Sequence, residues 1–199
     1  MNVLPQALGL LFLSAFFSFL SGKVVIIDAG HGGRDVGGKY GKVYEKHLAL
    51  DTAMRIEYYL KKKGYRTVMV RNTDCFVPLS QRAAYSNRFR DAIFISVHYN
   101  STWKSHVQGL ETFYHSSKSK ALAEACQQGM LKNSKAANRG VKFARYYVLR
   151  HCNHPAILVE GGFLSHSRER SKVMKGTYRD RLARGVVEGV IRYDKTSSW

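Results

Sequence analysis

Short apolar runs alternate with helical patterns along most of this chain, and the alternation constrains its fold more than any other feature. Val24–Asp28 is almost continuously apolar, as expected of a central strand buried on both faces. Glu45–Lys63 then repeats apolar side chains at helical spacing, and Gly64 follows as a C-terminal cap. Strands separated by helices predict an α/β fold, a single domain with a mostly parallel central sheet flanked by helices.

The rest of the chain continues this pattern. We expect further strands at Arg66–Val70, Ala92–His98, Gln108–Tyr114, Tyr146–Leu149 and Ala156–Glu160. We expect further helices at Leu79–Phe89, Ala121–Leu131 and Tyr178–Tyr193. A chain of 199 residues suffices for one domain with a full core, so we assign residues 23–194 to that domain and 195–199 to a frayed tail.

The N-terminal segment predicts export. Residues 1–22 contain no charged side chain, and Ala7–Leu20 is mostly apolar. This apolar stretch suits a signal peptide and is shorter than the roughly 20 residues that a membrane span needs. We therefore expect 1–22 to be a signal peptide or an N-terminal anchor, with a buried N-terminal helix or strand as the alternative. Export would place the protein in the periplasm or outside the cell, with membrane contact only through this segment if it stays uncleaved.

The composition is strongly basic, with a formal net charge of +18. Such a field attracts polyanions, which include nucleic acid, anionic lipid and the acidic polymers of a bacterial wall. A balance this basic by itself favours nucleic acid, but an exported protein rarely meets it, so we expect no nucleic-acid partner. Cys75, Cys126 and Cys152 are far apart and odd in number, which argues against a disulfide framework.

Four residues that can carry chemistry stand at strand ends or at a helix start: His31, Glu45, His98 and Glu160. The carboxyl ends of parallel strands share one edge of a sheet, so residues distant in sequence can meet there. Two imidazoles and one carboxylate form a zinc-binding set with one position left for water, and a second carboxylate can act as a base. This combination predicts a hydrolase site.

Each of these residues also has a simpler interpretation. His31 can belong to a glycine-rich phosphate loop, although GHGGRDVGG does not match the dinucleotide fingerprint. From the residues alone, Glu45 is better explained as a first-turn glutamate that complements the helix dipole. His98 can be a satisfied core histidine, and Glu160 can form a structural ion pair with an arginine.

Other polar residues near these strand ends are candidates for supporting roles. Asp28 can orient a ligand imidazole through its second nitrogen, Asn100 can contact a polar substrate, and Glu111 can support the site. His47 should point to a different face of its helix from Glu45. One loop carries a rival metal set, His151, Cys152 and His154. No second group of ligands elsewhere in the sequence would complete it, so these residues are better explained as the rim of a cleft.

Six segments together resemble the zinc-dependent N-acetylmuramoyl-L-alanine amidases of the amidase-3 type: VVIIDAGHGG, VYEKHLAL, RNTDCFVPLSQR, AIFISVHYN, GLETFY and AILVEGGFLSH. They occur in the family's order and span about residues 24–193. The resemblance implies that His31, Glu45 and His98 bind Zn²⁺ and that Glu160 is the catalytic glutamate. The chain departs from the family's usual residues at three positions outside this set, Ala29, Ala49 and His166.

The resemblance implies an exported, cell-wall-associated zinc hydrolase that cleaves the amide bond between N-acetylmuramic acid and L-alanine in peptidoglycan. Some members carry an inserted helix that blocks the zinc until an activator protein binds, and the stretch between Tyr114 and Arg139 looks too short for one. The sequence points to no particular activator. Two alternatives remain: a non-catalytic basic domain that binds peptidoglycan or nucleic acid, and a zinc peptidase acting on the stem peptide.

Overall fold

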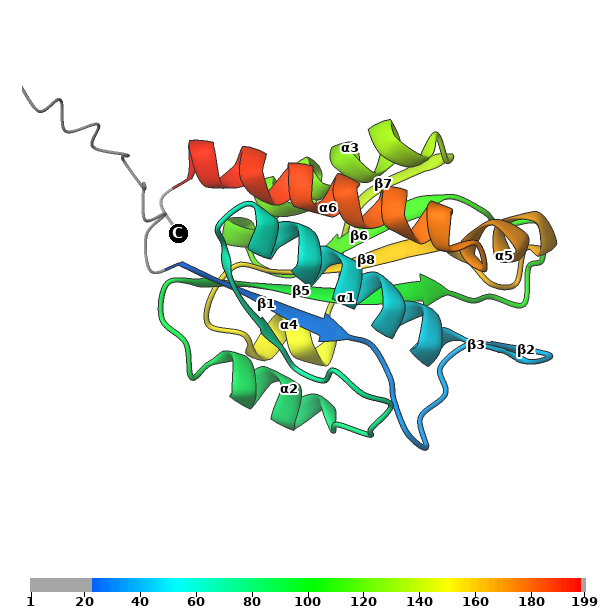
Figure 1. Ribbon diagram of the computed structural model, residues 1–199, viewed down its shortest axis with the longest axis horizontal. Coiled ribbons are helices and arrows are strands. Elements are labelled where there is room, and N and C mark those ends of the chain that lie inside the picture. Colours follow the sequence, from blue (N-terminus) through cyan, green and yellow to red (C-terminus); the bar gives the residue numbers. More distant parts are fainter. Residues whose placement is uncertain (1–22, 198–199) are drawn as a thin grey trace, which may run out of the picture.

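The computed structural model describes residues 23–197 of the chain (Figure 1). The predicted signal peptide or anchor, residues 1–22, lies outside the described residues. The predicted tail is partly wrong, because the last helix continues through Lys195 to Thr196. Within residues 23–197, no helix combines the length and the apolar character that crossing a membrane requires.

A six-stranded sheet forms the centre of the fold, in the order β4-β1-β5-β8-β6-β7. Its neighbours pair in parallel except β6 and β8, which are antiparallel. The strands in chain order are β1 (Val24–Ala29), β4 (Arg66–Met69), β5 (Ala92–Asn100), β6 (Leu110–Tyr114), β7 (Asn138–Phe143) and β8 (Ala156–Phe163). The predicted α/β fold with a mostly parallel sheet is therefore confirmed.

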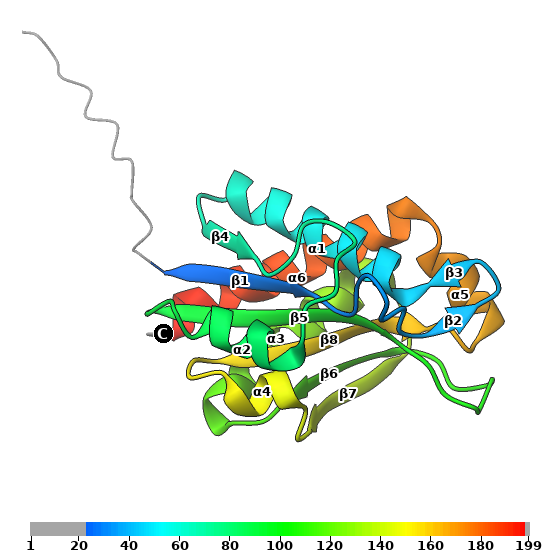
Figure 2. The ribbon, with the colours of Figure 1, turned by 90° about the horizontal axis from the view of Figure 1, so that it is seen from below.

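Helices cover the two faces of this sheet unequally. Three long helices pack on one face: α1 (Glu45–Lys62), α3 (Ser117–Ser134) and α6 (Gly176–Thr196). Two short ones lie on the other, α2 (Leu79–Ser86) and α4 (Tyr147–His151) (Figures 1 and 2). The helix α5 (Ser167–Val173) and the hairpin of β2 (Lys39–Tyr40) and β3 (Val43–Tyr44) lie past the carboxyl ends of the central strands.

The alternation of side chains along the central strands decides where a site can form. In β5, Ile95 and Val97 face the three long helices, whereas Phe94 packs in the smaller core beneath α2 and α4. Successive side chains of a strand point to opposite faces, so Ser96 and His98 share the face of Phe94. The two short helices cover only the first half of this face, and the polar residues of its second half line a pocket.

The predicted strand at Tyr146–Leu149 is wrong, because this segment forms the start of α4. Val148 and Leu149 are adjacent, and both are buried against the same small core. A strand would send adjacent side chains to opposite faces, whereas one helical turn buries both. The strand pairing with β6 is instead the polar β7, which the sequence pattern did not indicate because it is a largely exposed edge strand.

Glycines allow α3 and α6 to pack with their backbones in close contact. A Cβ atom on Gly129 would lie 2.0 Å from the carbonyl oxygen of Gly185, and one on Gly189 would lie 2.4 Å from the Cα of Cys126. Backbone atoms cannot move aside as a flexible side chain can. These glycines therefore fix the distance between the two helices, despite the low helix propensity of glycine.

We predict that Gly189→Ala lowers the free energy of unfolding by about 1–3 kcal/mol, the usual range for overpacking a core. The urea midpoint measures this change. Gly176→Ala is the matched control, because it lies in the same helix and its Cβ would meet only the ends of two flexible side chains, Arg55 at 3.2 Å and Arg179 at 3.8 Å. The control should be neutral or stabilising. A Gly189→Ala protein as stable as the control would contradict the close packing.

Candidate functional site

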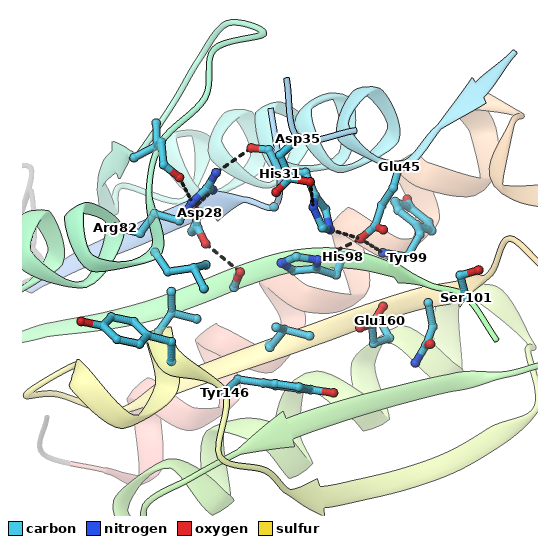
Figure 3. Close-up of a pocket in the computed structure, with 18 of the residues that line it drawn as sticks. Asp28, His31, Asp35, Glu45, Arg82, His98, Tyr99, Ser101, Tyr146 and Glu160 are labelled. Atoms are coloured by element: carbon cyan, nitrogen blue, oxygen red, sulfur yellow. Dashed lines mark hydrogen bonds and ion pairs between the residues drawn. The ribbon is translucent and has the colours of Figure 1, made fainter. Parts of the chain in front are cut away.

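A pocket of about 460 Å³ opens where β1, β5 and β8 end, on the sheet face that carries α2 and α4 (Figure 3). Its floor comes from strand residues on that face, Asp28, Ser96, His98, Asn100 and Glu160. In the sheet register, Asp28 lies beside Ser96, and His98 lies beside Glu160. The pocket thus occupies the part of the sheet that the two short helices leave open.

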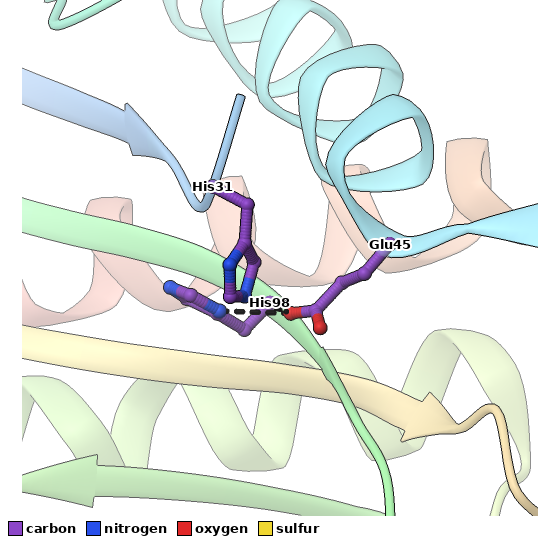
Figure 4. A group of neighbouring side chains, drawn as sticks. All are labelled: His31, Glu45 and His98. Carbon is purple, nitrogen blue, oxygen red and sulfur yellow. Dashed lines mark hydrogen bonds and ion pairs between the residues drawn. The ribbon is translucent and has the colours of Figure 1, made fainter. Parts of the chain in front are cut away.

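His31, Glu45 and His98 converge at the end of this pocket (Figure 4). The Glu45 Oε1 atom lies 3.1 Å from His31 Nε2 and 2.8 Å from His98 Nδ1. One ligand atom from each residue lies within 4.8 Å of the others, which makes this a group able to hold a metal ion. The three residues come from the loop after β1, the first turn of α1 and β5, so the predicted meeting at one sheet edge is confirmed.

Local backbone geometry fixes the position of His31. Its φ angle is +58°, a left-handed conformation that few non-glycine residues adopt. Gly30 brings the chain against His98, where a Cβ atom would lie 2.3 Å from the ring. Asp35 Oδ1 lies 2.9 Å from His31 Nδ1, which leaves Nε2 directed at Glu45. Burial acts to lower the pKa of His31, but the carboxylates of Glu45 and Asp35 raise it above the ordinary value.

Backbone amides hold the carboxylate of Glu45. The Gly38 N–H donates to Oε2 at 2.8 Å, and the Tyr99 N–H donates to Oε1 at 3.1 Å. Burial acts to raise the pKa of this carboxyl group, but His31 and His98 hold it well below its usual range. Glu45 is therefore an ionised, fixed group, and more than a first-turn glutamate that only complements the helix dipole. His47 points elsewhere as predicted, with its Nε2 3.5 Å from Asp74.

Glu160 is buried beside the three converging residues, with 7% of its surface exposed. Among residues 23–197, no hydrogen-bond partner reaches its Oε2 atom. Among the described residues, no arginine forms an ion pair with this oxygen, so the structural ion pair that was the alternative for Glu160 is not observed there. Burial raises the pKa of Glu160 well above its ordinary value, and the negative charges of Glu45 and Glu111 raise it further. A buried carboxyl oxygen without a partner is costly, which is typical of a functional group.

Glu111 faces Glu160 across the β6–β8 pair. Its Oε1 accepts from the Asn100 amide at 2.7 Å, and its Oε2 accepts from Arg139 Nε at 2.9 Å and Lys142 Nζ at 2.5 Å. Glu111 thus fixes Asn100, which lines the pocket, and places two cations behind it. Its supporting role stays a prediction, and these contacts are consistent with it.

The expected position of Asp28 is wrong, because its carboxylate hydrogen-bonds neither the His31 nor the His98 imidazole. Its carboxylate instead accepts from Arg82 Nη1 at 2.6 Å and from the Ser96 hydroxyl at 2.7 Å. The carboxylate beside an imidazole is that of Asp35, four residues after His31. Asp35 lies in the glycine-rich loop, where no periodic pattern indicates which side chain turns inward.

Two buried arginines hold the main chain that leads to His31. Arg82 donates to the carbonyl oxygens of Ala29 at 2.7 Å and His31 at 2.6 Å. Arg71 donates to Ala29 at 2.8 Å and to Gly30 at 2.6 Å. Sequence reasoning missed both roles. The available signal was the segment RNTDCFVPLSQR, which begins with Arg71 and ends with Arg82.

The rival cluster at residues 151–154 does not form a metal set, and none of His151, Cys152 and His154 lines this pocket. It precedes β8, so it lies at the opposite end of that strand from Glu160. His154 Nε2 lies 2.7 Å from the Ser86 hydroxyl, and the His151 ring stacks on Tyr147 with centroids 3.9 Å apart. These contacts account for both histidines.

Comparison with known proteins places this geometry among wall amidases. Residues 25–192 match the amidase-3 family model, described as N-acetylmuramoyl-L-alanine amidase. The amidase LytC of Bacillus subtilis is 32% identical over 176 residues, which are 86% of this chain and 36% of LytC. The germination-specific N-acetylmuramoyl-L-alanine amidase of the same organism is 29% identical, over 87% of this chain and 81% of its own length.

Solved structures agree with the sequence matches. An N-acetylmuramoyl-L-alanine amidase from Clostridium difficile 630 is 35% identical, with a TM-score of 0.86 over 88% of this chain and 98% of that one. The CwlD amidase of Clostridioides difficile, solved in complex with the GerS lipoprotein, is 26% identical, with a TM-score of 0.84 over 88% of this chain and 100% of that one.

We predict that Arg82→Met lowers the free energy of unfolding by about 3–5 kcal/mol, because it leaves the buried Asp28 carboxylate without its cation. Urea denaturation checks this, with Arg88→Met, an exposed arginine just past α2, as the control. The double variant Arg82→Met/Asp28→Asn should recover part of the loss, since no buried charge then stays unpaired. If Arg82→Met were as stable as Arg88→Met, the Arg82–Asp28 ion pair would not hold the loop.

Proposed function

The chain belongs to the amidase-3 family of N-acetylmuramoyl-L-alanine amidases, and from this membership we propose that it hydrolyses the amide bond between N-acetylmuramic acid and L-alanine in peptidoglycan. The family match bears out the resemblance of the six sequence segments. The observation that carries the proposal is the convergence of His31, Glu45 and His98 beside Glu160 in one pocket.

The donor set fits zinc. Imidazole nitrogens and a carboxylate oxygen are ordinary zinc ligands, and three protein ligands are the number typical of catalytic sites. The surrounding contacts fit as well, because Asp35 orients His31 and the Gly38 amide holds the second oxygen of Glu45. When bound, zinc supplies a water of lowered pKa and a positive charge near the scissile carbonyl.

Glu160 would act as the general base and then the general acid. Its Oε2 has no partner among the described residues, and it lies beside His98 in the sheet register. It would take a proton from the attacking water and return it to the alanine nitrogen as the amide bond breaks. Burial limits the access of bulk water to this carboxyl group. The hydrogen bond from Asn100 to Glu111 stabilises the neighbouring strands β5 and β6.

We further propose that peptidoglycan is the partner and that the protein works outside the cytoplasm at the wall. The net charge of +18 supports attraction to the anionic wall, and the uncharged residues 1–22 support export as a signal peptide or an anchor. A purely binding domain would not need a buried carboxyl group such as that of Glu160, whose Oε2 has no hydrogen-bond partner among residues 23–197. This observation favours the hydrolase over the non-catalytic alternative.

The first prediction here concerns the metal. The purified protein should bind about one zinc ion per chain through the three ligands. A chelator should abolish wall hydrolysis, and added zinc should restore it. Elemental analysis should show that His31→Ala and His98→Ala lose zinc, whereas His47→Ala keeps it because that side chain is 56% exposed and directed at Asp74. Full zinc content in His98→Ala would overturn the ligand set.

The second prediction separates the base from the ligands. Glu160→Gln keeps the size of the side chain but cannot take a proton, so the rate should fall roughly 10²–10⁴-fold while zinc is retained. Glu188→Gln is the control, because Glu188 is a surface residue paired with Lys132. Loss of zinc from Glu160→Gln would make Glu160 a ligand. Near-normal activity would assign the proton transfer to another group, with Glu111 the next to test.

A further inference from the structure

Exposed apolar side chains are concentrated on one side of the pocket. Of the nine large apolar residues that are exposed among the described residues, four line this pocket. We call them the aromatic wall: Phe76 (40% exposed), Leu79 (55%), Tyr146 (43%) and Tyr147 (39%). An apolar surface kept open to water in a pocket, beside a few polar groups, is typical of ligand binding.

The aromatic wall is formed by two segments on the same face of the sheet. Phe76 lies just before α2, which begins at Leu79. Tyr146 lies just before α4, which begins at Tyr147. The Tyr146 ring packs edge-on against the buried Phe113, with centroids 5.1 Å apart. Its hydroxyl points along the pocket floor toward Glu160 (Figure 3). The ring is therefore held in place while part of its surface stays free.

The opposite side of the pocket is polar, and cationic side chains lie behind its lining residues. Asn100 and Ser101 line it, and the Tyr40 hydroxyl lies 3.3 Å from the Ser101 hydroxyl. The Arg170 guanidinium lies over the Tyr40 ring, 4.9 Å from its centroid. Behind Asn100, Arg139 and Lys142 both contact the carboxylate of Glu111.

The two halves of the substrate differ in the same way as the two sides of the pocket. The muramyl half is a pyranose whose C–H faces can pack on aromatic rings, and its hydroxyls can bond a tyrosine hydroxyl. The stem peptide continues from L-alanine into a residue with a free carboxylate, which the polar side chains of Asn100 and Ser101 and the cations behind them would attract. The scissile amide joins the halves and must lie between the three ligands and Glu160.

We propose that the aromatic wall binds the muramyl sugar and that the Asn100–Ser101 side receives the stem peptide. This assignment rests on the proposed function, because it takes the muramyl amide as the bond cleaved. It fixes the direction in which the substrate crosses the site. Binding energy from the sugar would then hold the amide in position for attack, a use of remote contacts common in enzymes.

Binding of the two products to the zinc-loaded protein tests the assignment without requiring turnover. Isothermal titration with N-acetylmuramic acid and, separately, with L-alanyl-D-isoglutamate gives each affinity. Tyr146→Leu and Leu79→Ser should each weaken N-acetylmuramic acid binding about 10-fold or more, the loss of one buried apolar contact. Their dipeptide affinity should change far less.

Two variants outside the pocket are matched controls. Tyr58→Leu and Met54→Ser remove exposed side chains from α1, with exposures of 51% and 50%. They should leave both affinities unchanged. Leu79→Ser guards against misfolding, because Leu79 is the most exposed residue of the wall, whereas Tyr146→Leu alters the packing on Phe113. Melting temperatures identify any variant that is unfolded.

The outcomes separate this proposal from the proposed function. Equal weakening of both products, a larger loss for the dipeptide, or no measurable N-acetylmuramic acid binding by the parent protein would overturn the assignment. The parent protein could hydrolyse no muramyl amide while the aromatic-wall variants lose sugar binding. That result would support the assignment and reject the amidase reaction. If the parent protein hydrolyses the muramyl amide and the aromatic-wall variants bind the sugar unchanged, the amidase reaction stands and the assignment is overturned.

Discussion

The carboxylate of Glu45 bridges His31 and His98, and the arrangement of the site depends on this contact. It links the first turn of α1 to the loop after β1 and to β5, three elements that are separate in the sequence. A buried carboxylate is stable only when its oxygens are satisfied, and the amides of Gly38 and Tyr99 complete its shell. Gly30, which lies against His98, and the buried Arg71 and Arg82 hold the loop after β1 in place beside this contact.

The central strands and the edge at which they meet could be predicted because apolar runs report burial directly. The runs before His31, His98 and Glu160 are such segments, and the alternation of polar and apolar residues in β5 explains why Ser96, His98 and Asn100 share the open face. Glu45 could not be assigned from its own position, since a glutamate at a helix start is common. Only the family resemblance distinguished it.

The remaining errors have a physical cause in each case. A run of four residues at Tyr146 is too short to show whether two adjacent apolar side chains are buried on one side or on two. Asp35 meets His31 because positive φ angles at His31 and the following glycines reverse the chain, and such turns leave no periodic signal. The role of Arg82 depends on carbonyl oxygens far away in sequence, which a residue pattern does not contain.

Product analysis of digested cell wall tests the central claim most directly. Purified sacculi are digested in H₂¹⁸O and the products are resolved by mass spectrometry. The account predicts glycan strands whose muramic acid carries an ¹⁸O-labelled lactyl carboxyl group, together with intact stem peptides that begin with a free L-alanine amine. Cleavage inside the stem peptide, new reducing sugar ends, or no cleavage by zinc-loaded protein would contradict it.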